Sequence, residues 1–131
     1  MNKVIISFLT TFLTFSLISQ ATADDVKIGV ILGFTGPIES LTPTMASSAE
    51  LAMKEVSDSG LLLGGASVSS VRADSTCVDA GAATSAAERL VTSDNVAAIM
   101  GADCSGVTTA IANNVAVPNG VTIISPSATS P

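Results

Sequence analysis

Histidine, tryptophan and tyrosine are absent from this 131-residue chain, and phenylalanine occurs only four times. Without histidine, the chain lacks the general base of Ser-His-Asp and Cys-His catalytic sites and the commonest metal ligand. Its two cysteines are too few for a zinc site with four cysteine ligands. We therefore expect neither enzymatic activity nor a bound metal.

Positive charge is also scarce. Five Lys and Arg residues against eleven Asp and Glu residues give a formal net charge of −6. Nucleic acids and anionic membranes attract basic surfaces, so neither is an expected partner. The loop Gly33–Pro37 (GFTGP) follows an apolar run, as a dinucleotide-binding loop does, but it lacks the G-x-G-x-x-G fingerprint. We therefore expect no cofactor.

The first twenty-three residues have the three-part pattern of a secretory signal peptide. Lys3 supplies a positive charge, residues 4–19 form an uncharged apolar run, and Ala21-Thr22-Ala23 resembles a cleavage site. The run of about sixteen residues is shorter than the ~20 that cross a bilayer, although a membrane anchor is the alternative. We predict a signal peptide at residues 1–23 and a mature chain, residues 24–131, in the periplasm.

Beyond this leader, strand-like and helix-like segments alternate. Runs rich in β-branched and apolar residues predict strands at residues 26–32, 67–73, 96–100 and 121–124. Helical spacing of apolar residues predicts three buried stripes: Met45, Ala49, Ala52, Met53 and Val56; Ala83, Ala86, Ala87, Leu90 and Val91; Val107, Ala110, Ile111 and Val115. Thr42 and Asp79 are the predicted N-caps of the first two helices, and Gly60 ends the first.

This alternation predicts an α/β fold with a parallel β-sheet flanked by helices. The strand at 96–100 is wholly apolar, so we expect helices to bury both of its faces. Ligands of such sheets bind beyond the carboxyl ends of the strands. The loops predicted at that edge are residues 33–41, 103–106 and 125–131, and the loop after the second strand carries Cys77.

Four segments, in register and in order, carry a resemblance to a known family: KIGVILGFTGP, ADSTCVDAGAA, AAIMGADCSGVTTAIA and TIISPSATSP. Together they resemble the N-terminal lobe of type I periplasmic solute-binding proteins, and most of all the leucine/isoleucine/valine-binding proteins of branched-chain amino acid ABC transporters. Members have two α/β lobes that close on the ligand. The resemblance implies that residues 24–131 are part of the first lobe, and that the chain is a truncated product. Leu41 departs from the pattern, because many relatives have an aromatic residue there.

The resemblance implies that the chain is the substrate-binding component of an ABC importer. It would capture a small amino acid of the branched-chain type, or a related amide, and present it to a permease in the membrane. The alternative is the ligand-sensing domain of a receptor or regulator with the same fold. A secreted α/β hydrolase would need a G-x-S-x-G turn and a histidine, and the sequence has neither.

Cys77 and Cys104 follow the second and third predicted strands, so they lie in neighbouring loops at one edge. An oxidising periplasm favours a disulfide between them, and the resemblance implies the same pairing. Two free buried thiols are the alternative. A catalytic cysteine would lack a histidine to activate it.

Ser105 opens the third predicted helix, where backbone N–H groups and a hydroxyl suit a carboxylate. The residues alone favour a simple N-cap, whereas the resemblance implies that Ser105 holds the ligand α-carboxylate. It also places the Ser127-Ala128-Thr129 loop at the ligand. There Ser127 would offer its backbone carbonyl to the ammonium group, and Thr129 would offer its hydroxyl. A terminal tail without fixed shape is the alternative.

Asp74 and Asp103 lie beside the two cysteines. A carboxylate pair there could serve acid–base chemistry, but the simpler expectation is two solvated charges at the rim of the sheet.

We predict that the mature protein begins at Asp24, because small residues at Ala21 and Ala23 follow an uncharged apolar run. Intact-mass measurement of periplasmic material should give a chain that starts at this residue. A dominant species that retains residues 1–23 would contradict export by a cleaved leader.

Overall fold

Four parallel strands form the centre of the structure: β1 (Val26–Leu32), β2 (Val68–Asp74), β3 (Ala98–Gly101) and β4 (Thr122–Ile124). The computed structural model describes residues 25–130, so the predicted signal peptide lies outside the described residues. The strand order is β2-β1-β3-β4. The α/β fold with a parallel sheet, predicted from the alternating segments, is confirmed.

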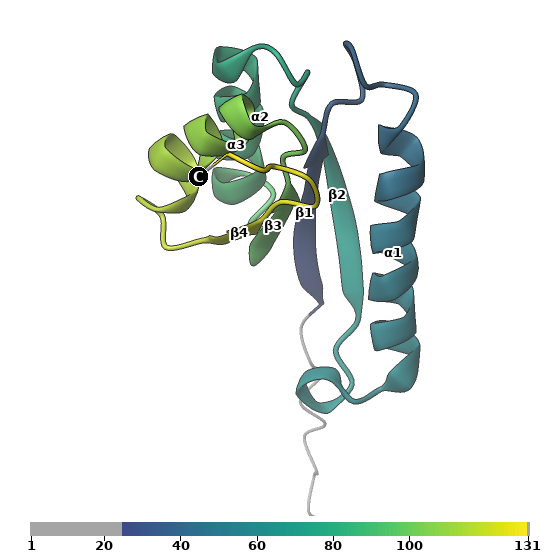
Figure 1. The fold of residues 1–131 in the computed structure, drawn as a ribbon. Helices are drawn as coiled ribbons and strands as arrows, with labels where there is room; N and C mark the ends of the chain where they lie inside the picture. Colours follow the sequence, from purple (N-terminus) through teal and green to yellow (C-terminus); the bar gives the residue numbers. More distant parts are fainter. Residues whose placement is uncertain (1–24, 131) are drawn as a thin grey trace, which may run out of the picture.

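Helices cover both faces of this sheet (Figure 1). Helix α1 (Thr42–Ser59) lies against one face, and α2 (Ala80–Thr92) and α3 (Ser105–Ile111) lie against the other. Helix α3 continues into a π-helical turn, η2 (Ala112–Ala116). Within residues 25–130, no helix has both the length and the apolar character needed to cross a membrane.

Strand β1 belongs to two hydrophobic cores, because alternate side chains of a strand point to opposite faces. Val30 and Leu32 pack with Ala46 of α1. Ile31 packs on the other face, in a cluster built largely from α2, α3 and η2 and including Ala83, Ala87, Leu90, Val107, Ile111 and Val115. All three β1 side chains are fully buried. This explains why residues 28–32 of the strand form an uninterrupted apolar run.

The strand order reverses at β1. The chain passes from β1 through α1 to β2 on one side, and then returns through α2 to β3 on the other side. In open α/β sheets, such a switch point leaves a crevice outside the carboxyl ends of the two strands. The pairing of Ile31 with Gly101 brings the loops after β1 and β3 to this point.

The start of α1 differs from the prediction. Leu41, not Thr42, is the N-cap, and no side chain caps this helix end. Thr42 is the first helical residue and is fully buried, and its hydroxyl donates a hydrogen bond to the Gly33 carbonyl at 3.0 Å. The two other predicted helix signals are confirmed. Asp79 accepts hydrogen bonds from backbone N–H groups at the start of α2, and Gly60 ends α1 with φ of 65°.

The predicted apolar stripe of α1 is only partly right. Val56 is exposed, and Glu50 turns toward the sheet instead. The reason is that β2 presents polar partners to this helix, since both Ser70 and Arg72 donate hydrogen bonds to the Glu50 carboxylate. The hydrogen bonds from Arg72 hold the pKa of Glu50 below its ordinary value.

Strand β3 starts two residues later than predicted and is not buried on both faces. Ile99 is buried under the helices, but Met100, on the opposite face, is partly exposed, and Ile124 of β4 is 68% exposed. In the described part of the chain, α1 is the helix on that face, and it contacts mainly β1 and β2. The expectation of full burial assumed a helix over every strand.

We predict that Gly101→Ala lowers the free energy of unfolding by about 3 kcal/mol. Gly101 has φ of +134°, and a Cβ there would lie 1.9 Å from the Ile31 carbonyl oxygen, which is backbone of the central strand. Urea denaturation measures the effect. The matched control is Gly106→Ala, where a Cβ meets no atom within 4 Å, so the change should stay within about 1 kcal/mol. Equal midpoints for Gly101→Ala and wild type would contradict the prediction.

Candidate functional site

Four loops leave the carboxyl edge of the sheet and gather at one end of the molecule (Figure 1). They follow β1, β2, β3 and β4 and comprise residues 33–41, 75–79, 102–104 and 125–130. The sequence predicted loops at this edge for each strand, and the parallel pairing of the strands confirms that they share it.

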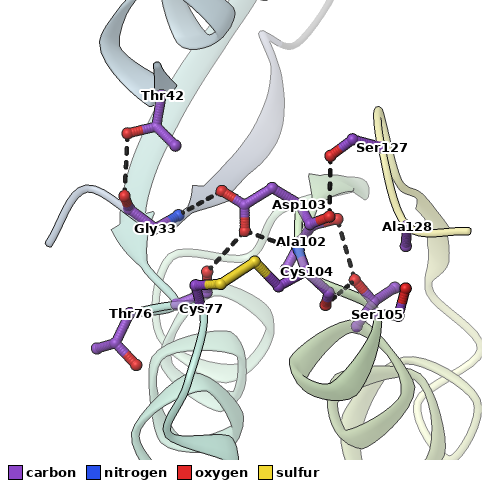
Figure 2. The surroundings of a disulfide bond; sticks show 12 residues. Gly33, Thr42, Thr76, Cys77, Ala102, Asp103, Cys104, Ser105, Ser127 and Ala128 are labelled. Atoms are coloured by element: carbon purple, nitrogen blue, oxygen red, sulfur yellow. Dashed lines mark hydrogen bonds between the residues drawn. A yellow bond between two sulfur atoms is a disulfide. The ribbon is translucent and has the colours of Figure 1, made fainter. Parts of the chain in front are cut away.

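Asp103 lies at the centre of these loops (Figure 2). Its Oδ2 accepts a hydrogen bond from the Gly33 N–H at 2.8 Å, and its Oδ1 accepts one from the Cys104 N–H at 2.9 Å. Ser75, itself fully buried, directs its hydroxyl at Oδ1 from 3.4 Å. Asp103 is 5% exposed, so the expectation of a solvated rim charge was wrong for this residue. The carboxylate is buried because it supplies acceptors to backbone donors at the switch point.

Asp74 ties the end of β2 to the loop after β1. It accepts hydrogen bonds from the Thr35 hydroxyl at 2.5 Å, the Thr35 N–H at 3.3 Å and the Thr76 N–H at 2.8 Å. Burial by itself raises the pKa of Asp74, but these hydrogen bonds stabilise the carboxylate more strongly, and the net pKa lies below its ordinary value. Asp74 and Asp103 accept hydrogen bonds from different residues of the loops after β1 and β2, and among the described residues no hydrogen bond joins the two carboxylates.

Cys77 and Cys104 form a disulfide, as predicted, with a Cα–Cα distance of 5.2 Å. The bond joins the loops after β2 and β3 (Figure 2). Gly33 lies against it, since a Cβ at Gly33 would be 3.3 Å from the Cys77 Cβ. The three loops at the switch point are therefore in direct contact.

The loop after β1 rests on the loop after β2. Gly36 has φ of +96°, and a Cβ there would lie 2.5 Å from the Thr76 carbonyl oxygen, so the close approach requires glycine. The Arg72 guanidinium lies 5.5 Å from the centre of the Phe34 ring and adds a contact between this loop and strand β2. Leu41, at the end of this loop, is 60% exposed.

Ser105 is the first residue of α3, and Cys104, not Ser105, is its N-cap. The Ser105 hydroxyl accepts hydrogen bonds from the Thr129 N–H at 3.0 Å and the Ser130 N–H at 3.2 Å. The simple N-cap role that the sequence allowed is therefore wrong. Ser105 connects the start of α3 to the loop after β4.

The loop after β4 has a defined shape, in contrast to the alternative of a shapeless tail. Ser127 donates its hydroxyl hydrogen to the Asp103 carbonyl at 2.8 Å (Figure 2). Ser125 donates to the Ala102 carbonyl and accepts from the Ala128 N–H at 2.8 Å. The structure thus brings Ser105, Ser127, Ala128 and Thr129 together at the carboxyl edge.

The chemistry available at this edge is that of hydrogen bonding. It offers hydroxyls, backbone N–H groups and carbonyls, and the residues that the structure describes contain no cluster of His, Cys, Asp and Glu that could hold a metal ion. A separate groove of about 480 Å³ lies between α1 and β2, lined by Glu50, Met53, Lys54, Ser57, Ser67, Val68 and Ser70. None of these is among the predicted site residues.

The residue of this edge whose burial the sequence interpretation misjudged is Asp103. A signal for its burial existed in the sequence, since it directly follows the apolar run from Val96 to Ala102. The partner of its carboxylate, the Gly33 N–H, is seventy positions away and has no sequence signal.

Comparison with known proteins identifies the family to which this arrangement is similar. A family model described as periplasmic binding protein matches residues 25–131. The Leu/Ile/Val-binding protein BraC3 of Rhizobium johnstonii is 30% identical over 129 residues, which cover 98% of this chain and 33% of the relative. The chain therefore spans about a third of the length of this curated relative.

Solved structures show the same relationship. The substrate-binding protein LivJ of a branched-chain amino acid transporter from Streptococcus pneumoniae, solved with isoleucine, superposes with a TM-score of 0.73 at 32% identity. That match covers 81% of this chain and 30% of LivJ. The leucine-binding protein LivK from Thermotoga maritima matches with a TM-score of 0.69 at 30% identity, over 80% of this chain and 28% of LivK.

We predict that loss of the Cys77–Cys104 bond lowers the free energy of unfolding by about 3.5 kcal/mol, because the bond closes a separation of 27 residues. Denaturant titration with and without reductant measures this difference. The Cys77→Ala variant is the control, because its stability should not respond to reductant. Two free thiols in denatured, unreduced periplasmic protein would contradict the bond.

Proposed function

The chain belongs to the periplasmic binding protein family, and from this premise we propose that it forms part of the substrate-binding component of an ABC importer. Residues 24–131 would make up part of the first of two lobes, with the candidate site at the carboxyl edge of the sheet. The residues from which this edge is built support binding rather than catalysis, because they are hydrogen-bonding groups without a nucleophile–base pair.

The ligand that fits this edge is a small amino acid of the branched-chain type or a related amide. LivJ was solved with isoleucine, and a substrate-binding protein from Desulfitobacterium hafniense, 26% identical to this chain, was solved with leucine. A zwitterion needs donors for its carboxylate and acceptors for its ammonium group. Hydroxyls, N–H groups and carbonyls at this edge supply both without a charged side chain.

We propose that Ser105 binds the ligand carboxylate. Its oxygen already accepts two N–H groups, and within residues 25–130 its hydroxyl hydrogen has no acceptor, so it remains available to donate. The backbone N–H groups in the first turn of α3 lie beside it and favour a negative charge. In the loop after β4, Ser127 would present its carbonyl to the ammonium group, Thr129 would present its hydroxyl, and Ala128 would line the site between them.

The observation that carries this proposal is the contact between Ser105 and the loop after β4. The 3.0 Å hydrogen bond from Thr129 N to Ser105 Oγ holds these two residues side by side, and a single small ligand would have to contact both at once. Their position at the switch point, where ligands of α/β sheets bind, supports the same assignment.

The proposed cellular setting follows from the family. Membership in a periplasmic binding protein family supports a location outside the cytoplasm. We propose that residues 1–23 direct export and are removed, that a second lobe closes over the ligand, and that the closed form docks on a permease in the membrane. Closure would be a shift between two conformations that the ligand stabilises by contacting both lobes.

We predict that Ser105→Ala weakens leucine binding by roughly 1.5–3 kcal/mol, the cost of losing a hydrogen bond to a charged group. Calorimetry with leucine, isoleucine and valine, on the protein as its own cells produce it, measures this change. The control is Ser85→Ala, which removes an exposed hydroxyl from α2 and should leave the affinity unchanged.

Isolated residues 24–131 should bind these amino acids more weakly than micromolar. Half a cleft leaves most of the ligand in water, where charged hydrogen bonds contribute little. Micromolar or tighter binding by the isolated segment would show that a second lobe is dispensable.

A further inference from the structure

The carboxylate of Asp103 is buried where the loops of the carboxyl edge meet. We propose that Asp103 is a positioning residue of the candidate site. It does not touch the ligand, but it places Ser105 and the loop after β4 where they meet the ligand. This inference rests on the proposed function, because it assigns a role within the same cleft.

Asp103 is bonded to the loops that follow all the other strands. Its side chain accepts hydrogen bonds from Gly33 N–H at 2.8 Å and Ser75 hydroxyl at 3.4 Å, in the loops after β1 and β2. Its main-chain carbonyl accepts the Ser127 hydroxyl, in the loop after β4, at 2.8 Å (Figure 2). At 5% exposure, its own side chain has almost no surface left for a ligand.

The connection from Asp103 to Ser105 is short. The carboxylate accepts the Cys104 N–H at 2.9 Å, which fixes the Asp103–Cys104 peptide one residue before Ser105, and the disulfide holds the Cys104 side chain. Ser127 holds the loop after β4 against the Asp103 carbonyl, and Thr129 of the same loop donates to Ser105. Both ligand-binding segments are therefore located by contacts to one residue.

The negative charge of Asp103 is satisfied by hydrogen bonds rather than by a cation. The ion pairs among residues 25–130 join other side chains: Lys54 with Asp58, Arg72 with Glu50, and Arg89 with Asp94. Hydrogen bonds to a carboxylate are shorter and stronger than neutral ones. Burying a charge is unfavourable unless such partners are present, so the donors and the carboxylate hold one another in place.

The geometry makes Asp103→Asn a selective test. Each carboxylate oxygen of Asp103 accepts a backbone N–H, from Gly33 at one and from Cys104 at the other. Asparagine is nearly isosteric but has one oxygen and one NH₂ group. In either orientation of the amide, its NH₂ group points at a backbone N–H, so one of the two loops loses its hydrogen bond.

Asp74→Asn is the matched control, because it is the same substitution at the end of the neighbouring strand. At Asp74, the hydrogen bonds from Thr35 N and Thr76 N share the single oxygen Oδ1. The other oxygen faces the Thr35 hydroxyl, which can rotate to accept from an NH₂ group. Asparagine at position 74 can therefore keep these three hydrogen bonds.

The first measurement is leucine affinity by calorimetry. Asp103→Asn should weaken binding by on the order of tenfold, and Asp74→Asn by less than about twofold. If Asp103 acts through Ser105, then adding Ser105→Ala to Asp103→Asn should cost much less than Ser105→Ala costs alone. Wild-type affinity in Asp103→Asn would overturn the inference. So would a double variant whose loss of affinity equals the product of the losses in the two single variants.

The second measurement needs no ligand. Amide hydrogen exchange of Thr129 and Ser130 reports the hydrogen bonds of the loop after β4 to Ser105. Exchange should be at least about tenfold faster in Asp103→Asn and unchanged in Asp74→Asn. Equal protection in Asp103→Asn and wild type would overturn the inference.

The two measurements separate the inference from the proposed function. If the wild-type protein binds none of leucine, isoleucine and valine, the proposal of a branched-chain amino acid as ligand fails, and the exchange rates alone decide the role of Asp103. If Asp103→Asn does not fold, Ser127→Ala takes its place, because it keeps the carboxylate and frees only the loop after β4. Faster exchange at Thr129 in that variant supports the inference, and an unchanged rate contradicts it.

Discussion

Burial of strand β1 on both faces is the constraint on which the rest of the structure depends. Val30 and Leu32 enter one core and Ile31 enters the other, and all three are fully buried. Burial of each such side chain contributes roughly 1.5–3 kcal/mol. Strands β2 and β3 lie on opposite sides of β1 in the sheet. The reversal of strand order at β1 creates the switch point where the candidate site lies.

The loops at that switch point are held by three different kinds of contact. The Cys77–Cys104 disulfide is covalent, the hydrogen bonds of Asp103 are charge-assisted, and Gly36 approaches Thr76 so closely that no other residue fits. A binding surface fixed before the ligand arrives loses little conformational entropy on binding. In the proposed two-lobed protein, this edge would be the preorganised half of the cleft, and the conformational change would lie in the approach of the lobes.

The sheet is covered unequally. The helices α2 and α3 lie along one face, whereas on the other face α1 covers β1 and β2 but leaves Met100 partly exposed and Ile124 exposed within the described residues. Parallel strands in α/β proteins are ordinarily covered on both faces. The chain spans 33% of the length of the Leu/Ile/Val-binding relative, and the proposed place in a larger lobe accounts for this exposed half of the sheet.

The sequence by itself determined the order of strands and helices, the cap at Asp79, the left-handed end of α1 at Gly60 and the partnership of the two cysteines. The caps are local signals and the order of elements follows from periodicity, and the parallel alternation then places the loops that follow the strands, two of which carry the cysteines, at one edge. Only the tertiary structure decided that Asp103 is buried, that Glu50 faces the sheet and that Thr42 bonds to a loop instead of capping its helix. Each of these outcomes depends on a donor or acceptor that comes from another segment of the chain. A residue's neighbours along the chain do not reveal which backbone group will meet its side chain after folding.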